Sequence, residues 1–291
     1  MRQPELLRRL NLADGHLSAA SGLVRVAELL YVVADDELHL GLFELAEPGP
    51  GRLLRLLPGK LPAPARARKA VKPDLEVLML LPDLGGEAQA TLLALGSGST
   101  LGRQRGVLLG LAQGSVPRSI DLAPWYEPLR EHFRDLNIEG GFLLDAELIL
   151  LQRGNQGLAA NAAVHYAWTQ VEAWLCGEAA APLPQAIQSL QLGVLDGVAL
   201  GFTDGVALSD GRWLFSAVAE NTGDSYNDGA CMGAVIGLVQ RDGQVRRLAQ
   251  LDGSWKVEGI ALAEDGSLLL VTDGDNPQVA ASLLRLPLSM L

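Results

Sequence analysis

The sequence predicts an all-β, five-bladed β-propeller, and three observations support this fold class. A short apolar strand that starts with a small or acidic residue, usually followed by glycine, recurs five times along the 291 residues. A second, more apolar strand follows each copy and ends in polar residues. The period closes on itself when the two chain ends are joined. A repeat of short strands that closes with nothing left over is typical of a ring of sheets.

The five starts are separated by 55, 63, 65 and 54 residues. The 33 residues after the last start and the 21 that lead to the first together make one further period of 54. The starts are Ser21-Gly22, Glu76-Val77, Glu139-Gly140, Asp204-Gly205 and Glu258-Gly259. The second strands are expected at 29–34, 91–95, 147–151, 213–218 and 267–272.

Each repeat is expected to hold four strands, which in the fourth repeat are 205–208, 213–218, 234–239 and 245–251. Turn residues such as Ser209-Asp210-Gly211 separate them. The last repeat has only three strands, so we expect residues 5–12 to add the outer strand beside 283–288 and to close the ring. The chain is therefore predicted to be a single propeller domain, 1–291.

Two other architectures remain open. A β-sandwich with coincidental spacing is one, and a six-bladed ring is the other, if the connection at 166–192 hides a blade. A helix is expected at 125–134, because Trp125, Leu129 and Phe133 recur at four-residue spacing.

Composition excludes several classes of protein. Apolar residues make up 48% of the chain and charged residues 20%, which excludes a disordered chain. No apolar run approaches 18 residues, so no membrane partner is expected. The net charge of −11 argues against nucleic acid as a partner. The first twelve residues lack an apolar signal region, so a cytoplasmic location is expected.

The starts of the inner strands should converge on the propeller axis at one mouth of the channel. Four of these five residues are carboxylates, which repel one another unless they take up protons or bind a cation. A ring of oxygens suits Ca²⁺, with Mg²⁺ or Mn²⁺ as alternatives, and the lack of histidine argues against zinc. The alternative is that each acidic residue caps a turn before its strand. The predicted metal ligands are Ser21, Glu76, Glu139, Asp204 and Glu258.

The second strands end at the same mouth, since they run antiparallel to the first. Their polar ends supply three candidate catalytic bases, Asp35, Glu220 and Asp273. Basic residues should gather there as well, and beside a metal they favour a small anionic ligand such as a phosphate. The alternative is that Lys69 and Lys72 belong to a solvated linker. The predicted ligand-binding residues are Lys69, Lys72, Arg103, Arg105, Arg153 and Lys256.

This pattern resembles the calcium-activated nucleotidases of the salivary apyrase type, five-bladed propellers with a Ser or Glu side chain from each blade around an axial calcium. The first blade, from Ser21-Gly22-Leu23-Val24 to Asp35-Asp36, is similar to the first blade of that family. The run Lys72-Pro73-Asp74-Leu75-Glu76 resembles the segment before its next calcium ligand. The segment from Glu258 to Ala261 also resembles bacterial phytase-like and gluconolactonase-like propellers. Overall, the chain most resembles a family of uncharacterised bacterial propellers.

The resemblance implies an axial metal and, less directly, hydrolysis, since a fold does not by itself define an activity. The first functional hypothesis is a metal-dependent phosphohydrolase that acts on a phosphate ester or anhydride. Two alternatives remain open: a lactonase or esterase that uses the same metal, and a non-enzymatic binding scaffold with a structural ion.

Overall fold

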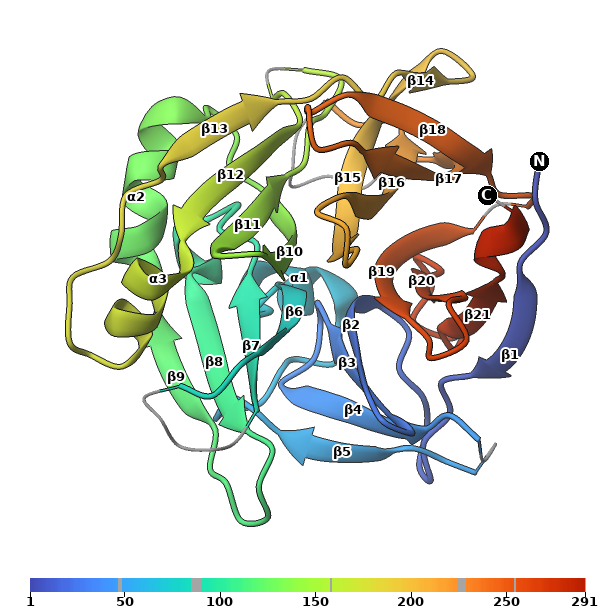
Figure 1. Cartoon of the computed structure of the whole chain (residues 1–291). Helices are drawn as coiled ribbons and strands as arrows, with labels where there is room; N and C mark the ends of the chain where they lie inside the picture. Colours follow the sequence, from blue (N-terminus) through green and yellow to red (C-terminus); the bar gives the residue numbers. More distant parts are fainter. Residues whose placement is uncertain (47–48, 85–89, 158, 224–228, 254, 291) are drawn as a thin grey trace.

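The computed structural model of the chain describes residues 1–290, apart from 47–48, 85–89, 158, 224–228 and 254. In these residues, antiparallel strands form five sheets arranged radially around a central axis (Figure 1). The predicted five-bladed β-propeller is therefore confirmed. The innermost strands of the five sheets, which surround the axis, are β2, β6, β10, β15 and β19.

The first three blades are each built from four consecutive strands. Blade one contains β2 (Ala20–Val26), β3 (Leu29–Ala34), β4 (His39–Glu44) and β5 (Arg52–Arg55). Blade two contains β6 (Leu75–Leu81), β7 (Thr91–Gly96), β8 (Arg105–Gly110) and β9 (Arg118–Asp121). Blade three contains β10 (Ile138–Leu144), β11 (Glu147–Gln152), β12 (Ala162–Ala167) and β13 (Ala186–Ser189).

Blades four and five depart from this pattern. Blade four has a short additional strand that pairs with its inner strand; it contains β14 (Val194–Leu195), β15 (Val198–Ala207), β16 (Trp213–Glu220), β17 (Cys231–Val239) and β18 (Val245–Gln250). Blade five joins the two ends of the chain; it contains β19 (Lys256–Leu262), β20 (Leu268–Asp273), β21 (Ser282–Leu286) and β1 (Glu5–Arg9).

Closure of the ring depends on the pairing of β1 with β21. The two strands are antiparallel, with Glu5 opposite Arg285 and Arg9 opposite Ser282. This confirms the prediction that the N-terminal segment supplies the missing outer strand of the last blade. A ring closed in this way needs no separate cap, because the first and last segments of the chain share one sheet.

Five apolar clusters lie between neighbouring blades and hold the ring together. The cluster between blades two and three is the one that also contains helices, α2 (Ala123–His132) and α3 (Trp168–Leu175). Trp125 and Tyr126 of α2 are fully buried there. The predicted helix at 125–134 is thus confirmed, shifted by two residues. The segment 166–192 holds α3 and β13 rather than a sixth blade.

The inner strands approach one another closely near the axis, which explains the glycines at the starts of the repeats. A Cβ atom on Gly259 would lie 2.3 Å from the carbonyl oxygen of Ser21, and one on Gly140 would lie 2.8 Å from the Cα of Asp204. Real Cβ atoms do not tolerate such distances. Glycine at these positions therefore allows the blades to converge.

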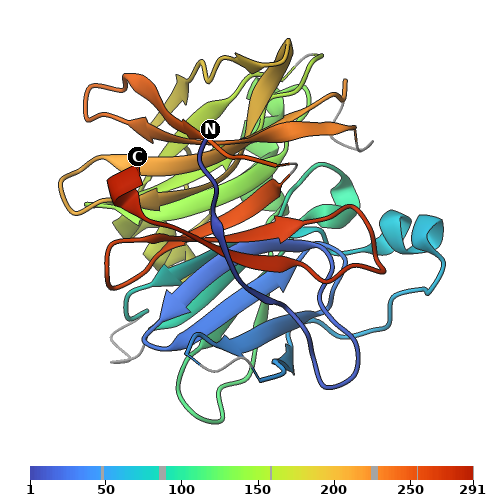
Figure 2. The ribbon, with the colours of Figure 1, turned by 90° about the vertical axis from the view of Figure 1, so that its right-hand side faces the viewer.

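The connection from blade one to blade two carries helix α1 (Ala65–Val71), which projects from one face of the ring in the side view of Figure 2. In the described residues, no helix has the length and apolar character needed to cross a membrane. Short 3₁₀ turns at Leu101–Arg103 and Leu288–Met290 complete the described secondary structure.

Candidate functional site

A β-bulge in every inner strand positions the residues of the channel mouth. In all five blades the register between the inner strand and its neighbour shifts at the same place. A bulge re-aims the side chain of the extra residue. The residues at the shift are Ser21, Glu76, Glu139, Thr203 and Glu258.

Four of these residues, all except Thr203, line a pocket at the mouth of the channel. The pocket has a volume of about 70 Å³, and its lining contains no aliphatic or aromatic side chain among the described residues. Since pockets for drug-sized molecules are mostly apolar, this lining favours an ion or a small, highly polar ligand. The lining residues are Ser21, Asp35, Lys69, Lys72, Asp74, Glu76, Arg103, Asn137, Glu139, Arg153, Gly154, Asn155, Glu220, Thr222, Lys256, Glu258 and Asp273.

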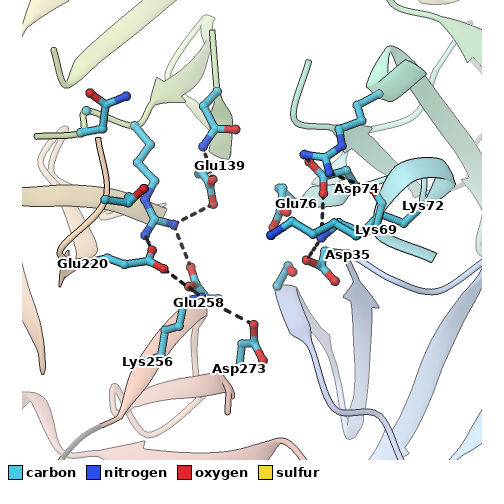
Figure 3. Close-up of a pocket in the computed structure, with 17 residues that line it drawn as sticks. Asp35, Lys69, Lys72, Asp74, Glu76, Glu139, Glu220, Lys256, Glu258 and Asp273 are labelled. Atoms are coloured by element: carbon cyan, nitrogen blue, oxygen red, sulfur yellow. Dashed lines mark hydrogen bonds and ion pairs between the residues drawn. The ribbon is translucent and has the colours of Figure 1, made fainter. Parts of the chain in front are cut away.

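Negative charge exceeds positive charge in this pocket. Seven of the described lining residues are carboxylates and five are lysines or arginines, which leaves an excess of two negative charges when all are ionised. Figure 3 shows the carboxylates in two groups, one around Glu220 and Glu258 and the other around Asp35 and Asp74.

Arg153 holds the first group together across three blades. Its Nη2 atom lies 2.5 Å from Oε2 of Glu220, and its Nη1 atom lies 3.4 Å from Oε2 of Glu139 and 3.7 Å from Oε2 of Glu258. These three glutamates come from blades four, three and five. The attraction of the glutamates raises the pKa of Arg153 despite its burial. The guanidinium is therefore the fixed counterion of this part of the mouth.

Lys256 is the second cation of the first group. Its Nζ atom lies 3.7 Å from a carboxylate oxygen of each of Glu220, Glu258 and Asp273, and 2.7 Å from Oδ1 of Asp275. Glu258 is only 6% exposed, and its Oε2 atom receives no hydrogen bond from any described residue. Glu258 thus has two cations at 3.7 Å, but no described residue donates a hydrogen bond to its Oε2 atom.

The second group lies between blades one and two and is built around Asp74. The Lys72 ammonium forms ion pairs with Asp35 and with Oδ1 of Asp74, the latter at 2.9 Å. Arg103 lies 2.9 Å from Oδ2 of Asp74, which also accepts a hydrogen bond from Ser97. Asp74 has a left-handed backbone conformation, with φ of 56°, which aspartate tolerates better than most residues.

Glu76 completes the second group. Carboxylate oxygens of Asp35, Asp74 and Glu76 all lie within 4.8 Å of one another. Among the described residues, none donates a hydrogen bond to the Glu76 carboxylate or forms an ion pair with it within 4.0 Å. Three carboxylates this close together form a local excess of negative charge that Lys72 offsets only in part.

Burial changes the acidity of both groups. It raises the pKa of Asp35 to about 6, that of Asp273 to about 7 and that of Glu258 to about 8, although neighbouring lysines and arginines act in the opposite direction. The pKa of Glu76 is raised well above its usual range by burial and by Glu139, Asp74 and Asp35. A cation bound in the pocket would favour the ionised carboxylates.

The structure brings most of the predicted site residues together. The three candidate bases, four of the five predicted metal ligands and five of the six predicted ligand-binding residues line the mouth pocket. Arg105 does not, because it is exposed at the start of β8, opposite Asp121 of β9.

Asp204 also lies away from the pocket. Thr203 occupies the bulge of β15, and Asp204 takes the next position, which corresponds to Gly140 in blade three. The Asp204 carboxylate accepts hydrogen bonds from the backbone N–H of Gly205 at 2.7 Å and of Ile260 at 2.9 Å, and Gly141 donates a further one. The fourth position of the predicted ring is therefore occupied by Thr203 and not by Asp204. The Thr203 hydroxyl donates a hydrogen bond to the hydroxyl oxygen of Ser216.

Four side chains of the pocket were not among the predicted site residues: Asp74, Asn137, Asn155 and Thr222. Asn137 donates a hydrogen bond to Oε1 of Glu139 and so orients that carboxylate. A signal for both Asp74 and Asn137 was present, because each lies two residues before a ring glutamate.

Fold and site together define a class: five-bladed β-propellers with a charged pocket at one mouth of the axial channel. The chain belongs to a family described as a family of unknown function (DUF6929), which matches residues 16–288. No curated protein matches the sequence.

Solved structures of similar fold include enzymes. The α-L-arabinofuranosidase PaAbf62A from Podospora anserina, in complex with cellotriose, has a TM-score of 0.52 at 10% identity, covering 97% of this chain and 95% of that one. An endo-arabinase from Bacteroides thetaiotaomicron has a TM-score of 0.51 at 10% identity, covering 98% and 97%. A luciferin-regenerating enzyme has a TM-score of 0.50 at 10% identity, covering 94% and 92%. Identities this low show a shared fold only.

Proposed function

We propose that the protein binds one divalent cation of the calcium type in the mouth pocket and uses the site to hydrolyse a small phosphate ester or anhydride. The observation that carries this proposal is the excess of two negative charges among the described pocket residues, together with the carboxylate oxygens of Asp35, Asp74 and Glu76 within 4.8 Å of one another. One divalent ion would neutralise that excess. The donors are oxygen atoms, as Ca²⁺, Mg²⁺ and Mn²⁺ prefer.

A bound divalent ion supplies Lewis acidity toward a phosphoryl oxygen. The protein's own residues would do the rest. Asp273 fits the role of general base, because its pKa of about 7 lies near neutrality and its side chain reaches the pocket. Asp35 and Glu220 fit it less well, because Lys72 and Arg153 hold them in close ion pairs. Lys69 and Lys256 would offset charge that develops on the phosphoryl group.

The test begins with protein stripped of metal by a chelator. Calorimetric titration with Ca²⁺, Mg²⁺ and Mn²⁺ should reveal one site per chain, and turnover of nucleotides or sugar phosphates should depend on the ion. Asp273→Asn should lower kcat at least 100-fold while ion affinity changes by less than threefold. Lactones and arabino-oligosaccharides in the same panel test ester and glycoside hydrolysis. An absence of ion binding would reject the proposal as a whole.

A second candidate, a binding scaffold with a structural ion, is favoured by the small size of the pocket. A volume of about 70 Å³ has room for an ion with a few waters, and any larger substrate would have to bind outside it. Lys72, Arg103, Arg153 and Lys256 each form at least one ion pair with a carboxylate. Ion binding without turnover of any compound in the panel would favour this candidate.

A further inference from the structure

We infer that the ion binds off the axis, between blades one and two, on Asp35, Asp74 and Glu76, and that it displaces the Lys72 ammonium, which serves as the bound cation of the ion-free protein. This inference rests on the proposed function, because it concerns the same pocket. It differs from an axial site on Glu76, Glu139 and Glu258, to which each of three blades would contribute one ligand.

The distances favour the off-axis position. Two oxygens that ligate one calcium ion at about 2.4 Å lie at most about 4.8 Å apart. Carboxylate oxygens of Asp35, Asp74 and Glu76 meet this condition together. They belong to two neighbouring blades, and Figure 3 shows them on one side of the pocket.

The opposite side of the pocket is already neutralised by the protein itself. Arg153 contacts Glu139, Glu220 and Glu258 within 3.7 Å, and Lys256 lies 3.7 Å from Glu258 and Glu220. A divalent ion at the axis would have to approach the Arg153 guanidinium, which is held in place by three blades. The repulsion between the two cations opposes binding there.

Lys72 is placed to exchange with an ion. Its ammonium already binds two of the three proposed ligands, Asp35 and Asp74, so that position accepts a cation. The lysine stem is long and flexible, and the residue directly follows helix α1 rather than lying in a strand. Its side chain is 13% exposed, and it can therefore turn toward the open mouth without movement of a blade.

Asp74 would keep its orientation when Lys72 leaves. Its Oδ2 atom is bound by Arg103 at 2.9 Å and accepts a hydrogen bond from Ser97, whereas Oδ1 contacts only Lys72 among the pairs described. Withdrawal of Lys72 thus leaves Oδ1 directed at the site. Asp74 is only 3% exposed, and its fixed position lowers the cost of ordering a ligand when the ion binds.

The experiment is calorimetric titration of the chelator-treated full chain with Ca²⁺ alone. Glu76→Gln should weaken binding at least tenfold, whereas the matched Glu139→Gln should change it less than threefold. Lys72→Met should tighten binding at least tenfold, since it removes the competing ammonium. Lys60 lies on the same connection between blades one and two but is exposed. As the matched control, Lys60→Met should leave the Ca²⁺ affinity unchanged.

Melting curves of each variant without Ca²⁺ establish that it folds, and Lys72→Gln repeats the measurement if Lys72→Met does not. Equal losses in Glu76→Gln and Glu139→Gln would place the ion on the axis and overturn the inference. Unchanged or weaker binding in folded Lys72 variants would overturn the exchange of Lys72 for the ion. A failure of the proposed function would look different, because neither the wild type nor any variant would then bind the ion.

Discussion

Asp204 shows how a buried carboxylate can stabilise the ring without taking part in the pocket. It is 4% exposed and accepts backbone hydrogen bonds from the inner strands of blades three, four and five. Asp204→Ala leaves these N–H groups without acceptors and should lower the free energy of unfolding by about 2–4 kcal/mol. Urea denaturation measures this loss. Calcium affinity should stay within threefold of wild type. A tenfold loss of affinity would instead show that Asp204 contributes to the ion site.

The raised pKa of Glu258 predicts how stability depends on pH in ion-free protein. Its folded pKa of about 8 exceeds the value near 4.3 of an unfolded chain. Between these values the folded state holds more protons, so its stability falls as pH rises through that window. The charged groups that face Glu258 are Arg153, Lys256, Glu139 and Glu220.

Urea denaturation of stripped protein at pH 5, 6, 7 and 8 tests this dependence. Stability should decrease across the series, and Glu258→Gln should show a smaller slope between pH 6 and 8, because one of the titrating groups is gone. Equal slopes in the two proteins would contradict the assignment of this dependence to Glu258.

At the residue scale, the sequence predicts which side chains gather at the mouth better than it predicts how they pair. Polar strand ends such as Asp35 and Asp273 could be placed because alternate strands end at the same mouth. The bulge that puts Thr203 rather than Asp204 in the ring depends on hydrogen-bond register, and both Thr203-Asp204 and Asp204-Gly205 fit a start motif. The position of Arg153 among three glutamates depends on how blades far apart in the chain pack together.

At the scale of strands, the close approach of the inner strands makes particular glycines necessary. Gly259→Ala would place a Cβ atom 2.3 Å from the Ser21 carbonyl oxygen, so blades five and one would have to separate. We expect a loss of about 2–4 kcal/mol in the free energy of unfolding. Gly274→Ala is the matched control, because nothing lies within 4 Å of its added methyl group. It should change stability by less than about 0.5 kcal/mol. Similar losses in the two variants would argue against the close approach.

The strands themselves follow closely from the sequence. The second strand of blade one, expected at 29–34, is observed as β3 (Leu29–Ala34). In blade four, however, β15 begins at Val198, six residues before Asp204, the expected start of the repeat. Its first half pairs with the end of β16 and with β14. The turn pair Asp196-Gly197, with φ of 50° and 81°, lies directly before Val198, so the sequence did carry a signal for this extension.

At the scale of the whole molecule, the pairing of β1 with β21 closes the ring. Deletion of residues 1–9 would leave β21 as an open edge of blade five. Open edges pair with other chains. The truncated protein should therefore melt at a lower temperature and self-associate, which differential scanning calorimetry and sedimentation velocity would measure. The mouth pocket contains none of these nine residues, so any folded monomer should bind Ca²⁺ with wild-type affinity.

Because Glu5 faces Arg285, the beginning and the end of the chain lie side by side in one sheet (Figure 1). The circular arrangement of blades thus has no inherent first member, and the linear gene interrupts it within blade five. A circularly permuted gene could join the end of β21 to the beginning of β1 through a short linker and open the chain in the connection between β5 and α1. Every blade of such a protein would consist of consecutive strands, five in blade four and four in each of the others. Its ribosomal synthesis would complete every blade before the next begins.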